Sequence, residues 1–487
     1  MKDENGSISP RQVYDVLIVG AGPVGLATAL GLRKRGITNI LVIDQTREFR
    51  KVGQGVDLLP NGLRALKYIG SDAYEKIKEP AVKALQPPDS QEPSNSPDEV
   101  KEKPALPKRL WRQKNIQGDT TRSFPTDFQS WFDRYGEGRV SVSWFDLQTT
   151  LRSLLPPDRV QANHRCINLE EEAGRVRIDT ISNTATSTNP FAHWEMRQSN
   201  VDTSGSTQES QGSDPESYYA KLVVAADGIN STIRQVLYDN KGLKEWAKPH
   251  YSGFSAISSR IDNVPNSIIE ELDNKYLQGE RIITVHNNSG QLNLPELKLL
   301  RLMLIYLPDN SVSYLLYAPF SLNAWQNKSL TEILDSGTQA LRNAKFPTIF
   351  TELIGLSNPE KLSHRLFYMH PVNTQNNFQP PWSHGRVILV GDAAHAMPPF
   401  MAQGANQGFE DAAVIVTFIA KLLQENGLDK ENAIANIFEK YEKIRRPFIE
   451  KIQTATMESN QWAQQQWDDF NEILHRRVYP SVVTLGE

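Results

Sequence analysis

Three glycines near the start of the chain have the spacing of a phosphate-binding turn. Gly20, Gly22 and Gly25 form the pattern G-x-G-x-x-G. In such a turn the first glycine permits the tight bend, the second lets the backbone approach a pyrophosphate, and the third lets a helix pack on the sheet. A helix that begins here would direct unpaired N–H groups at the phosphates. Asp44 follows at the distance, roughly 20 residues, where a carboxylate binds the ribose of a dinucleotide.

The residues around these glycines predict the elements that must hold them. Residues 16–19 (VLIV) and 40–43 (ILVI) are short apolar runs that suit buried parallel strands. Between them, apolar residues from Val24 to Leu32 would cover the inward face of a helix, and Gly36 would end it. A βαβ unit that binds no ligand has the same elements. We therefore predict nucleotide binding here, and the motif alone does not separate FAD from NAD.

Two further carboxylates follow short apolar runs. Asp227-Gly228 comes after residues 221–226 (KLVVAA), and Gly391-Asp392 comes after residues 386–390 (RVILV). In a doubly wound sheet the carboxyl ends of the strands form the edge where ligands bind. Carboxylates at that edge can accept hydrogen bonds from the hydroxyl groups of a dinucleotide. Each Asp could instead simply cap the helix that follows its strand.

Composition limits the remaining possibilities. The chain has 487 residues, enough for two or three domains, and its net charge of −4 gives no reason to expect nucleic-acid binding. Its single cysteine, Cys166, excludes an internal disulfide and favours a reducing compartment. The polar N-terminus has no signal-peptide core, and no apolar run reaches the roughly 18 residues of a transmembrane segment. We expect a cytoplasmic protein.

Two stretches read as insertions. Residues 87–108 are rich in Pro, Ser, Glu and Lys, and residues 181–217 are dominated by Ser, Thr, Asn, Gln and Gly. Neither composition can bury enough apolar surface to order itself, so we predict a mobile segment and a low-complexity segment. Between residues 251 and 366 the pattern changes to long alternating strands, with a hairpin that turns at residues 308–310. This change predicts a separate antiparallel sheet.

Taken together, the three glycine and aspartate turns resemble those of a known family, the single-component FAD-dependent aromatic hydroxylases (p-hydroxybenzoate hydroxylase-like flavoprotein monooxygenases). The matching segments are GAGPVG (20–25) with Asp44, DGINSTIR (227–234), GDAAH (391–395) through Pro398, Gly404, Ala405, Asn406, Glu410 and Asp411, and YEKIRRP (441–447). The resemblance covers the ends and the middle of the chain and excludes the two insertions.

This resemblance implies an α/β fold, in which a three-layer, Rossmann-like FAD-binding domain carries an inserted antiparallel β-sheet substrate domain and C-terminal helices. We expect the FAD-binding domain to comprise residues 1–75, 140–245 and 367–425. The substrate domain would comprise residues 76–139 and 246–366, and residues 426–487 would form a C-terminal helical region.

The resemblance also implies the cofactors. FAD would be bound, and NADH or NADPH would visit as a transient co-substrate. Asp392 would bind the ribityl chain of FAD, and a helix that opens at Gly404 would direct its N–H groups at the flavin N1–C2=O edge. Trp144 stands where the family commonly has an arginine, and Arg50, Arg139 and Gln148 are the candidate substitutes for it. The expected cofactor-binding residues are Gly20, Gly22, Pro23, Val24, Gly25, Asp44, Arg50, Gln54, Gln148, Asp227, Gly391, Asp392, Pro399, Gly404, Ala405 and Asn406.

The expected activity is that of a monooxygenase. Reduced flavin would react with O₂ to give a C4a-hydroperoxide, which would hydroxylate an aromatic or other conjugated small molecule. Three alternatives stay open. The first is an alkene epoxidase of the same family, and the second is a flavin-dependent dehydrogenase or reductase that does not use O₂ productively. The third is a flavoprotein that only binds a ligand or partner.

Other candidate residues carry weaker signals. The sequence identifies no catalytic base. We expect His395 to be structural and Cys166 to be a small buried residue. No His/Cys cluster has metal-ligand spacing, so no metal is predicted. The basic run KIRRP (443–447) is expected to be a solvated helix face. The Met and aromatic residues from Leu299 to Phe320 are expected to form core on one face of their strands, and on the other face they could line an apolar substrate pocket. The oligomeric state has no signature in the sequence.

Overall fold

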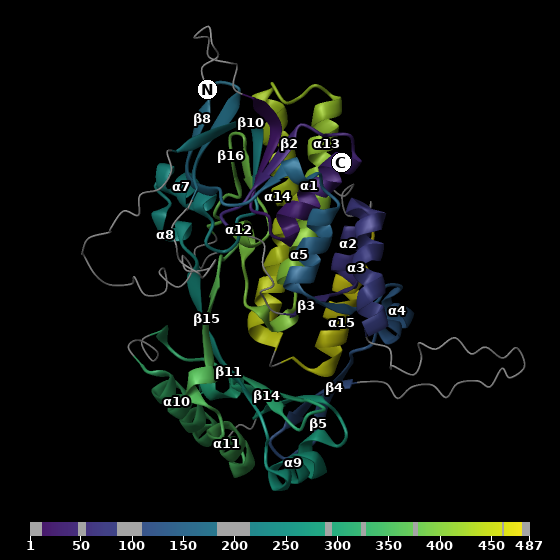
Figure 1. Cartoon of the computed structure of the whole chain (residues 1–487), viewed down its shortest axis with the longest axis vertical. Helices are drawn as coiled ribbons and strands as arrows, with labels where there is room; N and C mark the ends of the chain where they lie inside the picture. Colours follow the sequence, from purple (N-terminus) through teal and green to yellow (C-terminus); the bar gives the residue numbers. More distant parts are fainter. Residues whose placement is uncertain are drawn as a thin grey trace, which may run out of the picture.

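The computed structural model describes residues 12–46, 55–84, 110–182, 215–287, 295–322, 328–373, 378–459 and 462–479. Two large β-sheets, each with its own hydrophobic core, dominate this part of the chain (Figure 1). Helices cover the first sheet, and the second sheet lies at the other end of the molecule with α9, α10 and α11 (Figure 1). The predicted α/β fold is confirmed, and the domain boundaries given above stay a prediction.

The first sheet is built on parallel strands. Its order is β16 (Ser383–His384), β17 (Val387–Leu389), β10 (Glu216–Ala225), β1 (Val13–Val19), β2 (Ile40–Ile43) and β7 (Val160–Gln161). Antiparallel β9 (Arg175–Ile181) joins β10, and β8 (Arg165–Glu172) joins β9. The apolar runs predicted to be parallel strands therefore form the centre of the sheet, where both faces are buried.

The register of this sheet aligns the carboxyl ends of four strands. Val19 pairs with Ile43 on one side and with Ala225 on the other, and Ala225 pairs with Leu389. The glycine turn, Asp44 and the two later Asp-Gly turns all begin within a few residues of these pairs. The alignment therefore brings segments from distant parts of the sequence to one edge of the sheet.

Helices form the layers that cover this sheet. α1 (Pro23–Lys34) packs against α5 (Trp144–Ser153) and α13 (Gly404–Gln424), and α13 packs against α2 (Pro60–Ile69) and α14 (Glu431–Glu458). The remaining helices of this half are α3 (Ser71–Ala84), α4 (Phe128–Tyr135), α7 (Thr232–Asn240), α8 (Lys244–Ala247), α12 (Asp392–His395) and α15 (Gln464–His475). A two-stranded ribbon of β3 (Gly55–Leu58) and β6 (Val140–Ser143) lies beside them.

The second sheet has the order β15 (Ser363–Met369), β11 (His250–Ile261), β14 (Val312–Ala318), β13 (Arg301–Tyr306), β12 (Ile282–His286), β4 (Leu110–Asn115) and β5 (Thr120–Pro125). The predicted turn at residues 308–310 does connect β13 to β14. β4 and β5 also belong to this sheet, and both lie in the segment 76–139 that is expected to contribute to the substrate domain. The expectation of an antiparallel sheet is wrong for one pair of strands, because β4 pairs parallel with β12.

Alternation along its strands gives this second sheet two different faces. Leu302 and Leu304 of β13 are buried in a core with α10 (Leu330–Asn343) and α11 (Thr348–Gly355), as Val285 of β12 also is. α9 (Asn266–Leu272) adds to the same core through Leu272. The intervening residues, such as Arg301 of β13, face the opposite way, because neighbouring side chains of a strand alternate between faces.

Most of the two predicted insertions lies outside the described residues. This holds for all of residues 87–108 and for residues 183–214 of the second segment. At the ends of the second segment, β9 continues to Ile181 and β10 begins at Glu216, so those ends are strand rather than low-complexity chain. Cys166 is buried, as predicted.

Candidate functional site

The glycine turn between β1 and α1 has the shape of a phosphate cradle. Gly20 has φ of +108°, and a Cβ there would collide with the backbone carbonyl of Ala226. Gly22, by contrast, has φ of −70°, and a Cβ at this position would meet nothing within 4 Å. Gly22 is also the N-cap of α1, and no side chain caps this helix. The helix N-terminus therefore opens onto free space, which fits a pyrophosphate group.

Asp44 and Gln148 fix the peptide that follows Gly20. The Ala21 amide donates a hydrogen bond to Asp44 Oδ2 at 2.6 Å, and Gln148 Nε2 donates to the Ala21 carbonyl at 2.7 Å. The Thr46 amide donates to Asp44 Oδ1 at 2.6 Å. A carboxylate has about four acceptor positions, so Asp44 keeps capacity for a ribose hydroxyl while it stiffens the turn.

Asp227 lies at the same edge of the sheet, and only one of its two carboxylate oxygens accepts hydrogen bonds from described residues. Its Oδ2 accepts hydrogen bonds from the amides of Thr232 at 2.8 Å and Ile233 at 3.2 Å. Asp227 therefore caps two amides in the first turn of α7, as the alternative interpretation of its role expected, although Ser231 is the N-cap residue of this helix. Asp227 Oδ1 is buried without a hydrogen-bond partner in the described chain. Burial raises the pKa of this carboxyl to about 6, despite the hydrogen bonds that lower it.

Asp392 lies beside the N-terminus of α13. A Cβ on Gly404 would lie 3.7 Å from Asp392 Oδ1. The side chain reaches solvent and makes no hydrogen bond with a described residue, yet protein surrounds it closely enough that burial raises its pKa. No side chain caps α13, and the first three amides of a helix have no acceptor within the helix, so those of α13 are available to a ligand. The N-terminus of α13 can bind a negatively charged group, and the Asp392 carboxylate next to it can accept hydrogen bonds from hydroxyl groups.

Val24 and Asn406, which are also expected to bind the cofactor, lie close to the start of α13. Val24 lies beside the third turn and helix α13, since Cβ atoms on Gly391 or Gly408 would meet its side chain. The side chain of Asn406 is fully buried and already used. Its Oδ1 accepts from the Leu59 amide at 2.9 Å, and its Nδ2 donates to the Asp57 carbonyl at 2.9 Å. Only the backbone of Asn406 remains available to a ligand.

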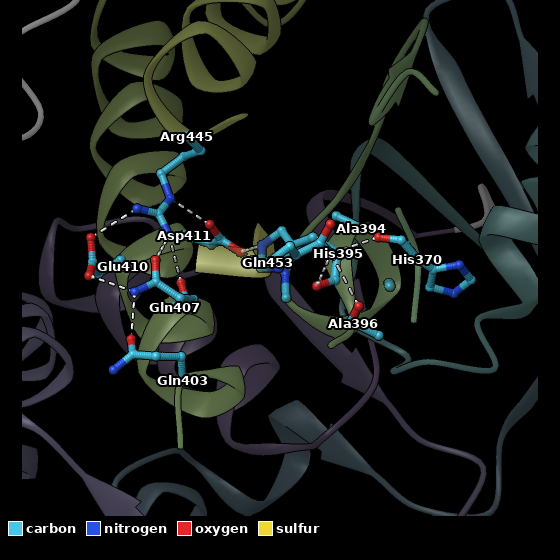
Figure 2. A network of polar contacts seen from close by, with 12 residues as sticks. His370, Ala394, His395, Ala396, Gln403, Gln407, Glu410, Asp411, Arg445 and Gln453 are labelled. Atoms are coloured by element: carbon cyan, nitrogen blue, oxygen red, sulfur yellow. Dashed lines mark hydrogen bonds and ion pairs between the residues drawn. The ribbon is translucent and has the colours of Figure 1, made fainter. Parts of the chain in front are cut away.

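A buried network of ion pairs and hydrogen bonds links α13 and α14 to the segment around His395 (Figure 2). Asp411 accepts hydrogen bonds from His395 Nε2 at 2.6 Å, from Arg445 Nε at 2.7 Å and from the Gly391 amide at 2.8 Å. Burial alone would raise the pKa of Asp411, but His395 and Arg445 lower it to about 2. His395 is therefore held in place by Asp411, in agreement with the structural role expected for it.

The same network reaches the start of α2 and the C-terminal part of the chain. Glu410 pairs with Arg445 at 2.9 Å and with Arg477 at 2.8 Å, and it accepts from Asn61 Nδ2 at 2.8 Å. Asn61 Nδ2 also lies 3.1 Å from Gln403 Oε1, just before α13 begins. The position of the α13 N-terminus is thus fixed by side chains from three distant segments.

The prediction that KIRRP (443–447) is a solvated helix face is wrong for its two arginines. Arg445 is fully buried, and Arg446 is 6% exposed. Arg446 donates to the carbonyl of Val372 at 3.0 Å and stacks over the ring of Trp382 at 4.2 Å. The two arginines turn inward because acids on α13 and free backbone carbonyls face them.

An aromatic cluster connects this edge to the second sheet. Phe400 directly follows Pro399, and its ring packs edge-on against three rings of the second sheet. Their centroids lie 5.2 Å (Phe254), 5.5 Å (Tyr317) and 5.6 Å (Phe367) from that of Phe400. Pro399 itself is exposed. No spacing in the sequence predicts this cluster, because its members come from four separate segments.

Two predicted residues, Arg50 and Gln54, lie outside the described part of the chain. Of the proposed substitutes for the missing arginine, Arg139 is paired with Asp57 at 2.7 Å, and Trp144 begins α5. Among the described residues, no three His, Cys, Asp or Glu side chains are grouped to hold a metal ion. No helix in the same part of the chain is both long enough and apolar enough to cross a bilayer.

Comparison with known proteins now identifies the class. Residues 13–86 and 335–456 match the profile of the family described as FAD binding domain. Salicylate hydroxylase from Pseudomonas putida is 24% identical over 91% of this chain and 85% of its own length. The 3-amino-4-hydroxybenzoate 2-monooxygenase PtmB3 from Streptomyces platensis is 25% identical over 91% of this chain and 87% of its own length.

Solved structures agree on the fold. A salicylate hydroxylase substrate complex superimposes with a TM-score of 0.64 at 17% identity and covers 98% of both chains. Klebsiella pneumoniae HpxO, complexed with FAD and uric acid, has a TM-score of 0.58 at 16% identity and covers 97% of this chain and 95% of its own. The fold and the matched profile define an FAD-binding protein. The chain is similar over 91% of its length to single-component FAD-dependent aromatic hydroxylases, and it is an FAD-dependent oxidoreductase of the monooxygenase class.

Proposed function

We propose that this enzyme uses NADH or NADPH and O₂ to hydroxylate an aromatic or other conjugated small molecule. In this reaction a hydride and a proton supply two reducing equivalents. One oxygen atom of O₂ enters the substrate, and the other leaves as water. The observation that carries the proposal is the meeting of three turns at one sheet edge, directly beside an aromatic cluster from the second sheet.

The residues at this edge fit FAD. The amides at the start of α1 would bind the pyrophosphate above Gly22, and Asp44 would accept hydrogen bonds from the ribose. Asp227 and Asp392 would accept hydrogen bonds from the ribityl hydroxyls, for which Asp227 Oδ1 is free among its described neighbours. The start of α13 would face the N1–C2=O edge of the flavin. Bound FAD would supply the electron transfer and oxygen activation that no side chain provides.

The protein would contribute placement and electrostatics. Negative charge on the reduced flavin would be stabilised by the three uncapped amides of α13, without any movement at the moment of reaction. The buried pairs of Arg445 with Glu410 and Asp411 hold that helix in position. Phe400 and the rings around it would exclude water and orient an apolar substrate.

The test is a turnover assay on the purified protein. After reconstitution with FAD, oxidation of NADH and of NADPH is followed in air with phenols, indoles and polyenes, together with O₂ uptake and product mass. We expect one class of compound to accelerate oxidation and to gain one oxygen atom. An epoxide from a polyene would instead identify the alkene epoxidase. Oxidation of a compound without O₂ uptake, or absence of any reduction by either nicotinamide, would refute the proposal.

A further inference from the structure

The last described residues of the chain fold back onto the helices around the start of α13. α15 packs against α2, and residues 476–479, called the C-terminal segment below, follow α15 directly. Tyr479 packs against Tyr68 of α2, with ring centroids 5.4 Å apart. Arg477 reaches α13, where its Nε donates a hydrogen bond to Glu410 Oε2 at 2.8 Å. The C-terminal segment therefore connects α2 to α13.

The two arginines of this segment have different surroundings. Arg477 Cζ lies 3.8 Å from the ring centroid of Phe448 on α14, and the Arg477 side chain is only 15% exposed. The Glu410 carboxylate that it contacts is fully buried. Arg476, by contrast, pairs with Glu472 of α15, and its side chain is 59% exposed. Of these two adjacent arginines, only Arg477 reaches a buried acid.

Arg477 balances the charge of two buried acids on α13. Glu410 and Asp411 are both fully buried, and Arg445 pairs with them at 2.9 Å and 2.7 Å. One guanidinium neutralises one of these two negative charges, and Arg477 supplies a second positive charge. Burial alone would raise the pKa of Glu410, but Arg477 and Arg445 lower it. Glu410 lies roughly 9 Å along the helix axis from the first residue of α13, so an unbalanced charge there would oppose an anion bound at the helix N-terminus.

Hydrogen bonds continue from Glu410 to the first turn of α13. Glu410 Oε1 accepts from Asn61 Nδ2 at 2.8 Å and from Gln407 Nε2 at 3.2 Å. The same two amide groups donate to Gln403 Oε1, at 3.1 Å and 2.8 Å respectively. Gln403 is the N-cap residue of α13, and all of these side chains are buried. A shift of the Glu410 carboxylate would therefore disturb the hydrogen bonds that fix the start of the helix.

We propose that Arg477 is a positioning residue for the flavin. Through Glu410 it fixes the first turn of α13 and balances its buried charge, so that the helix N-terminus stabilises reduced FAD more strongly than oxidised FAD. This inference rests on the proposed function, which places the flavin at the start of α13. Reduction adds negative charge to the flavin, and the positive end of a helix stabilises that charge. Loss of Arg477 should therefore weaken reduced FAD more than oxidised FAD and lower the midpoint potential of the bound flavin.

The midpoint potential of the bound flavin tests this role. Each FAD-loaded protein is reduced stepwise beside a dye of known potential, without O₂, nicotinamide or substrate. The Kd of oxidised FAD is measured separately by fluorescence quenching, and urea unfolding of the apoprotein checks folding. The variants are Arg477→Gln, which removes the charge, and Arg477→Lys, which keeps it. Arg476→Gln is the matched control, because it removes an equal charge from the adjacent residue, whose partner is Glu472.

We expect Arg477→Gln to weaken reduced FAD about three- to tenfold more than oxidised FAD, which lowers the two-electron midpoint potential by about 15–30 mV. Arg477→Lys should have an intermediate potential, and Arg476→Gln should have that of the unchanged protein. A merely structural role for Arg477 would lower the urea midpoint or weaken both forms of FAD equally, and either change leaves the potential where it was.

The inference is overturned if the potential of Arg477→Gln equals or exceeds that of the unchanged protein. It is also overturned if Arg476→Gln lowers the potential as much as Arg477→Gln does. If Arg477→Gln does not fold, Arg477→Lys decides alone. A fall in its potential then supports the role of Arg477, and an unchanged or higher potential overturns it.

These results are separable from those of the turnover assay, because the potential is measured without O₂ or nicotinamide. If Arg477→Gln lowers the potential but no compound gains oxygen, the role of Arg477 stands and the proposed function fails. If a compound gains oxygen and the potential of Arg477→Gln is unchanged, the proposed function stands and the role of Arg477 is wrong.

Discussion

Replacement of Gly22 by alanine should separate FAD binding from folding. Gly22 has an ordinary φ of −70°, and an added Cβ meets nothing within 4 Å, so the variant should fold normally. Changes of this kind alter the free energy of unfolding by about 1 kcal/mol or less. The same methyl group would occupy the space that the pyrophosphate needs. Loss of two charge-assisted hydrogen bonds would cost about 3 kcal/mol or more, which is roughly a 100-fold loss of FAD affinity.

The assay combines two measurements on the apoprotein. Urea unfolding gives the stability, and titration with FAD, followed by quenching of flavin fluorescence, gives the Kd. Gly20→Ala is the contrasting variant, because its Cβ would strike the Ala226 carbonyl and its φ is +108°. That variant should lose stability as well as FAD. If Gly22→Ala binds FAD as tightly as the unchanged protein, the pyrophosphate does not lie at this turn.

Three further predictions concern single side chains. Asp392→Asn should leave the urea midpoint unchanged, since the side chain reaches solvent and makes no hydrogen bond with a described residue, and it should weaken FAD binding about tenfold. An equal Kd for FAD would contradict the role of Asp392 at the ribityl chain. Arg445→Met should lower the free energy of unfolding by about 3–5 kcal/mol, because Glu410 and Asp411 would stay buried without it; a loss below about 1 kcal/mol would show that the network matters little. Burial lowers the pKa of His475 to about 3, so the neutral histidine contributes fully to stability above pH 6.5 and this contribution is lost as the pH falls. The free energy of unfolding should therefore fall with decreasing pH between pH 6 and 4, and His475→Phe should reduce that slope by about 1.4 kcal/mol per pH unit. An unchanged slope in the variant would contradict this assignment.

The parts of the fold that the sequence predicts well are those with local signals. The strands at residues 16–19 and 40–43 and the hairpin turn at residues 308–310 each depend on a few adjacent residues. The meeting of the three turns was predictable for a related reason. Parallel strands place their carboxyl ends at one edge, so each short apolar run also indicated where the residue after it would lie.

The parts that could not be predicted depend on partners far away in the sequence. A basic run on a helix is normally solvated, and nothing near Arg445 shows that Glu410 and Asp411 will face it across a helix pair. The pairing of β4 with β12 joins strands more than 160 residues apart. Arg477 is one of two adjacent arginines, and only its contact with Glu410 distinguishes it from Arg476.

The most direct test of the central claim is the origin of the oxygen in the product. The FAD-loaded enzyme is supplied with NADH or NADPH and the best compound of the turnover assay under ¹⁸O₂, and in parallel in H₂¹⁸O under ordinary O₂. We expect the product to gain one ¹⁸O atom from the gas and none from the water. Incorporation from water alone, or a product oxidised without added oxygen, would show that this protein is not a monooxygenase.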